Sequence, residues 1–253
     1  MIKVENVSKI FTLSKKQQKE LATTDKTTTA VDSISFECQP GKIYSLLGPN
    51  GAGKTTTMRM LSTIYQPTSG SIIIGGVDAV KHPQEARRKI GFLTGSAGLY
   101  GRLTANEIIQ YFGDLYGVER SVFEQRKQHL FDLMDMHDFA NKRIAKLSTG
   151  MKQKVSIART MIHDPEVVVF DEPTSGLDVI TSENIIRLIK DCKDQGKTVI
   201  FSSHIMSEVD LLSDDIGIIH KGRMLFNGTK EEFIANRQED SLTAEFIRIV
   251  KQA

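Results

Sequence analysis

Eight consecutive residues in the first quarter of the chain have the types and spacing needed to hold phosphate. The run Gly48-Pro49-Asn50-Gly51-Ala52-Gly53-Lys54-Thr55 fills every fixed position of the pattern G-x-x-x-x-G-K-[ST]. The glycines let backbone N–H groups turn toward the phosphates, and Lys54 brings a positive charge to the β and γ phosphates. The Thr55 hydroxyl is then expected to hold Mg²⁺, with Thr56 beside it in the first helical turn. The run predicts a nucleoside triphosphate site.

The residues on either side of this loop agree with that prediction. The run 43–47 before it predicts a buried strand, and Met58, Leu61 and Ile64 after it recur at helical spacing. A glycine-rich turn that binds nothing is the alternative, and the strand, loop and helix order disfavours it.

Two adjacent carboxylates, Asp171 and Glu172, follow the apolar run 167–170. Because parallel strands open onto the ligand crevice at their carboxyl ends, this position favours a role in the site. Asp171 is expected to hold Mg²⁺ through its water shell, and Glu172 to orient the water that attacks the γ-phosphoryl group. A simple turn is the alternative, which the phosphate-binding loop disfavours.

Ser148 precedes a helix whose predicted buried face contains Met151, Val155, Ala158 and Ile162. Free N–H groups and a hydroxyl at such a helix start attract anions. Taken alone, the pattern predicts only a helix N-cap.

Short β-branched runs separated by helical segments predict parallel strands buried on both faces. These runs are 167–170, 198–201 and 216–219. Local alternation around Ile2, Val4, Ile34 and Phe36 predicts an antiparallel layer, to which residues 71–75 add.

A helical block interrupts this α/β order. Thr104 with Glu107 and Ser121 with Glu124 predict two capped helices, followed by a looser segment at 137–146.

The polar stretch 12–29 predicts an extended, mobile surface loop, either a partner contact near the nucleotide or a solvated insertion. Residues 229–253 predict a small helical appendage, expected to pack on the core or, alternatively, to form a dimer contact.

Composition narrows the class of protein. The 253 residues are 40% hydrophobic and 25% charged with a formal net charge of +2, which is typical of a globular protein and predicts no nucleic-acid partner. Cys38 and Cys192 are far apart and lack metal-ligand spacing, so we expect two reduced structural thiols. No signal peptide or membrane-spanning segment is expected, because no apolar run approaches 18 residues.

The order of these motifs resembles the ATP-binding-cassette (ABC) family over nearly the whole chain. The phosphate loop is followed by Leu147-Ser148-Thr149-Gly150-Met151, then Asp171-Glu172, Ser175-Gly176-Leu177-Asp178 and His204. The family signature usually reads LSGGQ, so Ser148 and Gly150 match it. Thr149 and Met151 depart from it in a way that resembles partners of ABC-2-type exporters.

The resemblance implies ATP and Mg²⁺ as ligands and a head-to-tail dimer, with a homodimer favoured, that holds two ATP molecules between subunits. Ser148, Gly150 and Met151 of one copy would close on the γ-phosphate held by Lys54 of the other, and Asp178 would contact the opposite subunit. His204 would touch the γ-phosphate and position Glu172.

Three further segments bear on this resemblance. Phe11 matches the aromatic residue that stacks on adenine, with core packing as the alternative. The family normally has a glutamine where this chain has Gly95, so Ser96 or a water would have to take its place beside Mg²⁺. The segment 99–103 resembles the surface that receives a partner's cytoplasmic helix.

We therefore expect an α/β fold: a P-loop NTPase core with a mostly parallel sheet and helices on both faces, an antiparallel β layer and an inserted helical subdomain. Residues 1–95 and 158–228 would form the core of one ABC nucleotide-binding domain, 96–157 the helical subdomain with the signature, and 229–253 the appendage.

The expected function is the ATP-hydrolysing subunit of a membrane exporter, bound peripherally to a transmembrane permease at the cytoplasmic face. The motifs look like those of sodium-extruding exporters of the Nat type, so sodium is the favoured cargo, with drugs, antibiotics or peptides as alternatives. A soluble ABC ATPase acting on ribosomes or DNA and a metabolic P-loop kinase are the other classes considered.

Overall fold

A computed structural model of the protein describes residues 1–20, 22–94 and 98–252. The strands are β1 Ile2–Thr12, β2 Thr27–Cys38, β3 Ile43–Leu47, β4 Ser69–Ile74, β5 Val77–Asp78, β6 Ile90–Leu93, β7 Val167–Asp171, β8 Thr198–Ser203, β9 Asp215–His220 and β10 Arg223–Thr229. The α-helices are α1 Lys15–Glu20, α2 Lys54–Leu61, α3 Pro83–Arg88, α4 Ala105–Leu115, α5 Arg120–Leu133, α6 Thr149–Met161, α7 Val179–Asp194, α8 Met206–Leu212, α9 Lys230–Ala235 and α10 Leu242–Gln252.

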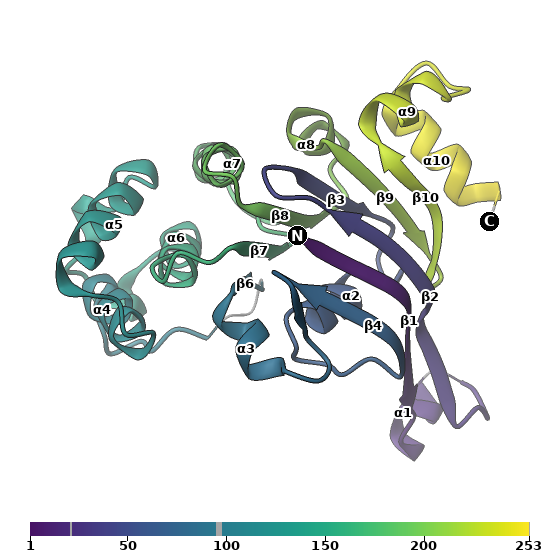
Figure 1. The fold of residues 1–253 in the computed structure, drawn as a ribbon, viewed down its shortest axis with the longest axis horizontal. Helices are drawn as coiled ribbons and strands as arrows, with labels where there is room; N and C mark the ends of the chain where they lie inside the picture. Colours follow the sequence, from purple (N-terminus) through teal and green to yellow (C-terminus); the bar gives the residue numbers. More distant parts are fainter. Residues whose placement is uncertain (21, 95–97, 253) are drawn as a thin grey trace.

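Two sheets organise the fold (Figure 1). A six-stranded sheet in the order β10-β9-β3-β8-β7-β6 is parallel except for β10, which pairs antiparallel with β9. A four-stranded antiparallel sheet runs β2-β1-β4-β5. The predicted fold class is therefore confirmed, including the antiparallel layer and the helical insert.

The parallel strands are mostly apolar, and every residue of β3, β7 and β8 is buried, because both faces of the sheet are covered. In β7, Val167 and Val169 pack into the core shared with α2 and the antiparallel sheet, whereas Val168 and Phe170 pack into the core under α6 and α7. The carboxyl ends of the strands remain uncovered by this packing, which leaves room for a site at that edge.

Helices α4 and α5 lie beyond α6, at the left of Figure 1 and away from the antiparallel sheet. Thr104 caps α4 with the predicted box, its Oγ1 accepting from the Glu107 N–H at 3.2 Å. The predicted cap of the next helix was wrong: Glu119 is the N-cap of α5, and its carboxylate accepts from Ser121 N–H at 3.0 Å. A carboxylate directly before the helix reaches those free N–H groups first. The segment 137–146 contains two short 3₁₀ turns, His137–Phe139 and Ile144–Lys146.

The polar stretch 12–29 is more regular than predicted. Strands β1 and β2 stay paired to Thr12 and Thr27, and α1 lies at the tip of this hairpin, at the lower right of Figure 1. The prediction of an extended, mobile surface loop missed this regular structure, because the strand pairing at the ends and α1 between them satisfy backbone groups even where the side chains are polar. Of its side chains, Leu13 is buried.

The helix after the phosphate-binding loop is also shorter than predicted. It ends at Leu61, so Met58 and Leu61 are buried as expected, whereas Ile64 lies beyond the helix and is exposed. The appendage consists of α9 and α10, which pack against β9, β10 and α8.

Cys38 and Cys192 are both buried free thiols, and burial raises the pKa of each to about 12.

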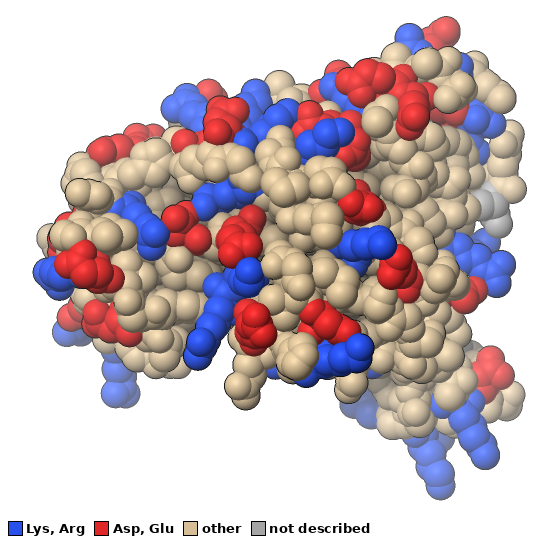
Figure 2. Space-filling model, in the orientation of Figure 1, with Lys and Arg blue, Asp and Glu red and all other residues tan. Residues whose placement is uncertain are grey.

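Within the described ranges, none of the helices combines the length and hydropathy needed to span a bilayer. Acidic and basic side chains intermix over the face shown in Figure 2, without a continuous basic groove on that face.

Candidate functional site

The loop between β3 and α2 lies close against the backbone of strands β9 and β2. A Cβ atom on Gly48 would lie 2.3 Å from the Ile219 carbonyl oxygen, so only glycine fits there. Gly53 has φ +112° and directly precedes the first residue of α2. These two positions let the loop turn sharply and direct the helix N-terminus, with its free N–H groups, toward the end of the sheet.

The buried Lys54 side chain hydrogen-bonds to the backbone of the loop. This side chain is 4% exposed, and its Nζ donates to the carbonyl oxygens of Gly48 at 2.7 Å and Pro49 at 3.2 Å. The same ammonium lies 3.3 Å from Glu172 Oε1. A buried cation held by backbone oxygens and one carboxylate is positioned to attract an anion at the loop.

Thr55 and Asp171 supply adjacent oxygen ligands. Thr55 Oγ1 donates to Asp171 Oδ1 at 3.2 Å, and Asp171 is buried at the end of β7. Mg²⁺ prefers oxygen donors and takes only one or two protein ligands when it also binds phosphate. The donor set of these two residues therefore fits Mg²⁺.

Glu172 adopts an unusual backbone conformation. Its φ of +49° is in the left-handed region, which costs a residue with a side chain about 1–3 kcal/mol. In this conformation its carboxylate meets Lys54 on one side and His204 on the other, with His204 Nδ1 3.4 Å from Oε2. Neighbouring structure must maintain this conformation, because the chain alone would not favour it.

Ser202 belongs to this cluster although the sequence motifs did not include it. Its Oγ donates to Asp171 Oδ1 at 2.8 Å and accepts from the Glu172 N–H at 3.0 Å. Asp171 and Ser202 are paired across β7 and β8, so one hydroxyl orients both carboxylate residues. A serine at the end of a neighbouring predicted strand was the available signal.

These side chains border an open cleft of about 510 Å³ between α2, β7 and the start of α6. It is lined by Asn50, Thr55, Arg59, Thr94, Thr149, Gln153, Asp171, Glu172, Ser175 and Leu177. Arg59 was also missed, although it follows Thr55 by one helical turn and therefore shares its face. Gln153 donates to the Pro173 carbonyl at 3.1 Å and had no comparable signal in the sequence.

The signature residues form a second cluster. Ser148 is the predicted N-cap of α6, accepting from the Met151 N–H at 3.2 Å. Asp178 caps α7 and accepts from Thr181, whose side chain stands next to Gly150. Ser148 is exposed, whereas Gly150 and Met151 are half-buried. The structure thus brings Asp178 to the signature segment of its own chain, and Thr149 of that segment lines the same cleft as Glu172.

Phe11 lies on β1, half-buried, with its ring edge-on to Tyr65 at 5.4 Å between centroids. Lys9 Nζ lies 5.1 Å from the centre of the Phe11 ring. Phe11 therefore belongs to a small aromatic cluster at the surface. Gly95 and Ser96 lie outside the described residues.

Comparisons with known proteins agree with this geometry. The protein-family model described as ABC transporter matches residues 31–175. The ABC transporter ATP-binding protein NatA of Bacillus subtilis (strain 168) is 44% identical over 224 residues, which cover 88% of this chain and 91% of that protein. The bacitracin transport ATP-binding protein BcrA of Bacillus licheniformis is 39% identical over 197 residues, covering 78% of this chain and 63% of that protein.

Solved structures give the same result. A structure described as the ATP-binding subunit of an ABC transporter has a TM-score of 0.84 at 25% identity and covers 98% of this chain and 99% of its own. A dimeric ATP-binding cassette in a post-hydrolysis state, bound to ADP and Pi, has a TM-score of 0.78 at 25% identity and covers 90% and 98%. The chain belongs to the ABC transporter family and is an ATP-binding, ATP-hydrolysing subunit of a transporter.

Proposed function

We propose that this subunit powers an exporter: ATP binding closes two copies head to tail, and hydrolysis followed by release reopens them. The observation that carries this proposal is that Lys54 and His204 both contact Glu172, which lines one cleft together with Thr55 and Asp171. A ligand shifts a conformational equilibrium only by its differential affinity for the two states. A triphosphate gripped from both subunits would supply that difference.

Each residue has a separate proposed task. Lys54 and the N–H groups of the loop bind the β and γ phosphates, and Thr55 and Asp171 hold Mg²⁺, which when bound neutralises phosphate charge. Glu172 accepts a hydrogen bond from the attacking water and orients it. His204, beside Glu172 Oε2, holds that carboxylate in position and contacts the γ-phosphate.

We expect Ser202→Ala to lower the hydrolysis rate about tenfold and to raise the Mg²⁺ concentration that is required. The change removes one hydrogen bond to Asp171 and leaves the Glu172 N–H without its partner, each costing about 1–3 kcal/mol. ATPase rates measured over a Mg²⁺ titration test this. Ser213→Ala, which removes another buried hydroxyl that contacts Ser45, is the control. Wild-type behaviour of Ser202→Ala at every Mg²⁺ concentration would contradict the role.

The head-to-tail dimer is supported by what surrounds Asp178. The next two residues, Val179 and Ile180, are 83% and 72% exposed although both are aliphatic. Exposed apolar residues beside Ser148 and Thr149, the exposed part of the signature segment, form a surface that a second copy would cover. We propose that Ser148, Gly150 and Met151 meet the partner's phosphate loop there and that Phe11 stacks on adenine.

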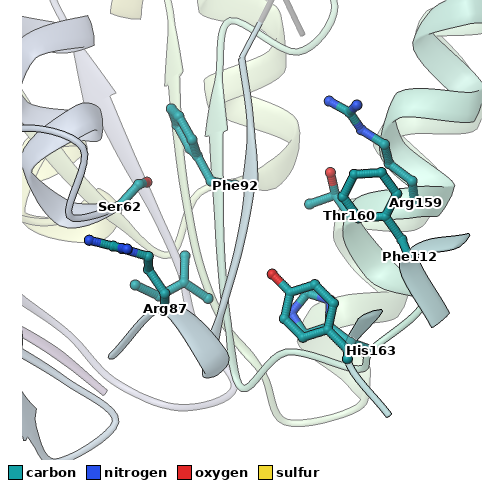
Figure 3. A pocket seen from close by; sticks show the side chains of 9 residues that line it. Ser62, Arg87, Phe92, Phe112, Arg159, Thr160 and His163 are labelled. Carbon is teal, nitrogen blue, oxygen red and sulfur yellow. The ribbon is translucent and has the colours of Figure 1, made fainter. Parts of the chain in front are cut away.

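A permease is proposed to dock on the face formed by α4 and the segments before it. Tyr100, Gly101, Arg102, Leu103 and Tyr111 line a mostly apolar hollow of about 540 Å³. A second hollow of about 260 Å³ is lined in part by Phe112, whose ring contacts Tyr111 edge-on. Figure 3 shows that second hollow between two walls, Ser62, Arg87 and Phe92 facing Phe112, Arg159, Thr160 and His163.

The second hollow is suited to a partner segment that has both apolar and polar side chains. Tyr116 stacks on His163 at 3.9 Å between centroids, so the wall is aromatic. Among the described residues, the buried Ser62 Oγ has no hydrogen-bond partner, and Arg159 lies over the Phe112 ring. An amphipathic helix would bury the aromatic surface and meet these polar groups.

We expect Tyr111→Glu to reduce recovery of the membrane subunit with this chain at least tenfold. The Tyr111 side chain is half exposed at the proposed interface, and a carboxylate there would have to be desolvated on docking. The measurement is co-purification from detergent-solubilised membranes, with ATPase activity of the isolated chain as a folding check. Ile247→Glu on α10 is a matched exposed apolar control. Equal recovery of the membrane subunit with both variants would exclude this docking face.

For cargo we propose sodium. The support is the identity to NatA and the motifs shared with sodium-extruding exporters. Relatives named for bacitracin transport and linearmycin resistance make antibiotics the second candidate. Purifying the tagged chain from native membranes tests the function: a stoichiometric multi-span subunit supports it, and sodium flux through that complex then tests the cargo. Recovery with only soluble partners would favour a non-transport cassette ATPase. We also propose that the subunit attaches peripherally to the membrane at its cytoplasmic face. For the domain limits, we propose a core of residues 1–95 and 158–228, a helical subdomain of 96–157 and an appendage of 229–253.

A further inference from the structure

A buried carboxylate outside the known motifs connects the two segments that carry Glu172 and His204. Glu208 lies in the first turn of α8 and is 7% exposed. Its Oε1 accepts from Thr174 Oγ1 at 2.5 Å, and its Oε2 accepts from Ser203 Oγ at 2.9 Å. Both hydroxyl residues are themselves buried.

This carboxylate is held without a cation. Among the described residues, no Lys, Arg or His lies within ion-pair distance of Glu208. Burying a carboxylate is costly unless its oxygens are hydrogen-bonded. An apolar side chain at this position would avoid that cost, so packing alone does not explain a glutamate here.

The partners of Glu208 are adjacent to the catalytic residues in sequence. Thr174 follows Glu172 by two residues, after Pro173, and Ser203 directly precedes His204. Ser203 Oγ also accepts from the Ile205 N–H at 3.0 Å, so the backbone on both sides of His204 is tied to the same network. Glu208 therefore connects the two segments whose side chains meet at 3.4 Å between His204 Nδ1 and Glu172 Oε2.

We propose that Glu208 is a positioning residue for ATP hydrolysis: it bridges Thr174 and Ser203 and thereby holds His204 against Glu172. This inference rests on the proposed roles of Glu172 and His204. Glu208 contacts neither phosphate nor water in this role, and it acts only through the geometry of the two segments.

A double-mutant cycle tests the proposal in the full chain. We expect Glu208→Gln to lower kcat about tenfold while the KM for ATP changes less than about twofold, because the phosphate loop is untouched. In a His204→Ala background, the same change should lower kcat by no more than about twofold, because the residue that Glu208 positions is gone. A purely structural role would give the same fold-loss in both backgrounds.

Controls separate positioning from folding. Glu245→Gln removes another buried carboxylate, on α10, which accepts from Arg248, and should reduce thermal stability without changing kcat. Thr174→Val and Ser203→Ala each remove one hydrogen bond to Glu208 and should reproduce part of the kcat loss if Glu208→Gln fails to fold. Wild-type kcat in both of these variants would overturn the proposal.

The remaining outcomes distinguish this inference from the proposed function. A full tenfold loss in the His204→Ala background would overturn the positioning role and leave the exporter ATPase intact. Wild-type kcat in His204→Ala would overturn both the role of His204 and this inference, whereas the assignments of Lys54 and Glu172 are tested by their own variants.

Discussion

Glu172→Gln is expected to lower ATP hydrolysis at least a hundredfold and to trap an ATP-bound dimer. Glutamine keeps the size of the side chain and one hydrogen-bonding oxygen, but it lacks the negative charge that orients and polarises the attacking water. It also removes the ion pair with Lys54 and the charge beside His204, so the phosphate site becomes more positive. ATP should therefore bind at least as tightly while its cleavage slows.

Two measurements check this result. Steady-state ATPase rates give the loss of hydrolysis, and size-exclusion chromatography with light scattering gives the mass with and without ATP. A dimer that forms with ATP and not with ADP would support the head-to-tail closure. Hydrolysis by Glu172→Gln at the wild-type rate would contradict the assignment of Glu172, and a monomer in saturating ATP would contradict the proposed closure.

Lys54→Ala is expected to raise the Kd for ATP at least a hundredfold. The Lys54 ammonium is the buried cation of the loop, fixed by two carbonyl oxygens and Glu172. Its loss removes a charge-assisted contact to phosphate, and it leaves the Glu172 carboxylate facing the phosphates without the ion pair that offsets its charge. Both effects oppose binding of a polyanion.

Equilibrium titration with a fluorescent ATP analogue checks the loss of binding. Lys42→Ala is a suitable control, because Lys42 is an exposed lysine that pairs with Asp215 away from the cleft. Thermal unfolding of both variants shows whether the fold survives. Undiminished binding by a folded Lys54→Ala protein would contradict the role of the loop.

Ser202 and Glu208 illustrate why parts of the site could not be predicted from sequence. Ser202 reaches Asp171 because β7 and β8 pair in one particular register, in which these two residues are partners. Shifting that register by one residue would turn the hydroxyl to the other face of the sheet. Glu208 reaches Thr174 because α8 packs against β8, which pairs with β7, the strand that precedes Thr174. Neither contact is indicated by a pattern of neighbouring residues in the sequence.

The wrong predictions share a physical reason with these omissions. Ser121 with Glu124 fits a capping box, but Glu119, in extended conformation just before the helix, accepts the free N–H groups instead. The polarity of residues 12–29 indicated an extended, mobile surface loop, yet β1 and β2 stay paired at its two ends and α1 forms between them. In both cases, hydrogen bonds that the sequence pattern did not include decided the local structure.

The sequence by itself determined the phosphate-binding loop, the strands around it and the fold class. Those features depend on contiguous residues: glycines that permit a close turn at Gly48 and Gly53, and β-branched runs that favour buried strands. Only the tertiary structure decided how Glu172 meets Lys54 and His204, and that Ser202 and Thr174 donate to the carboxylates of Asp171 and Glu208. Such contacts join residues far apart in the chain, and their distances follow from strand register and helix packing rather than from the local conformational preferences that a sequence pattern records.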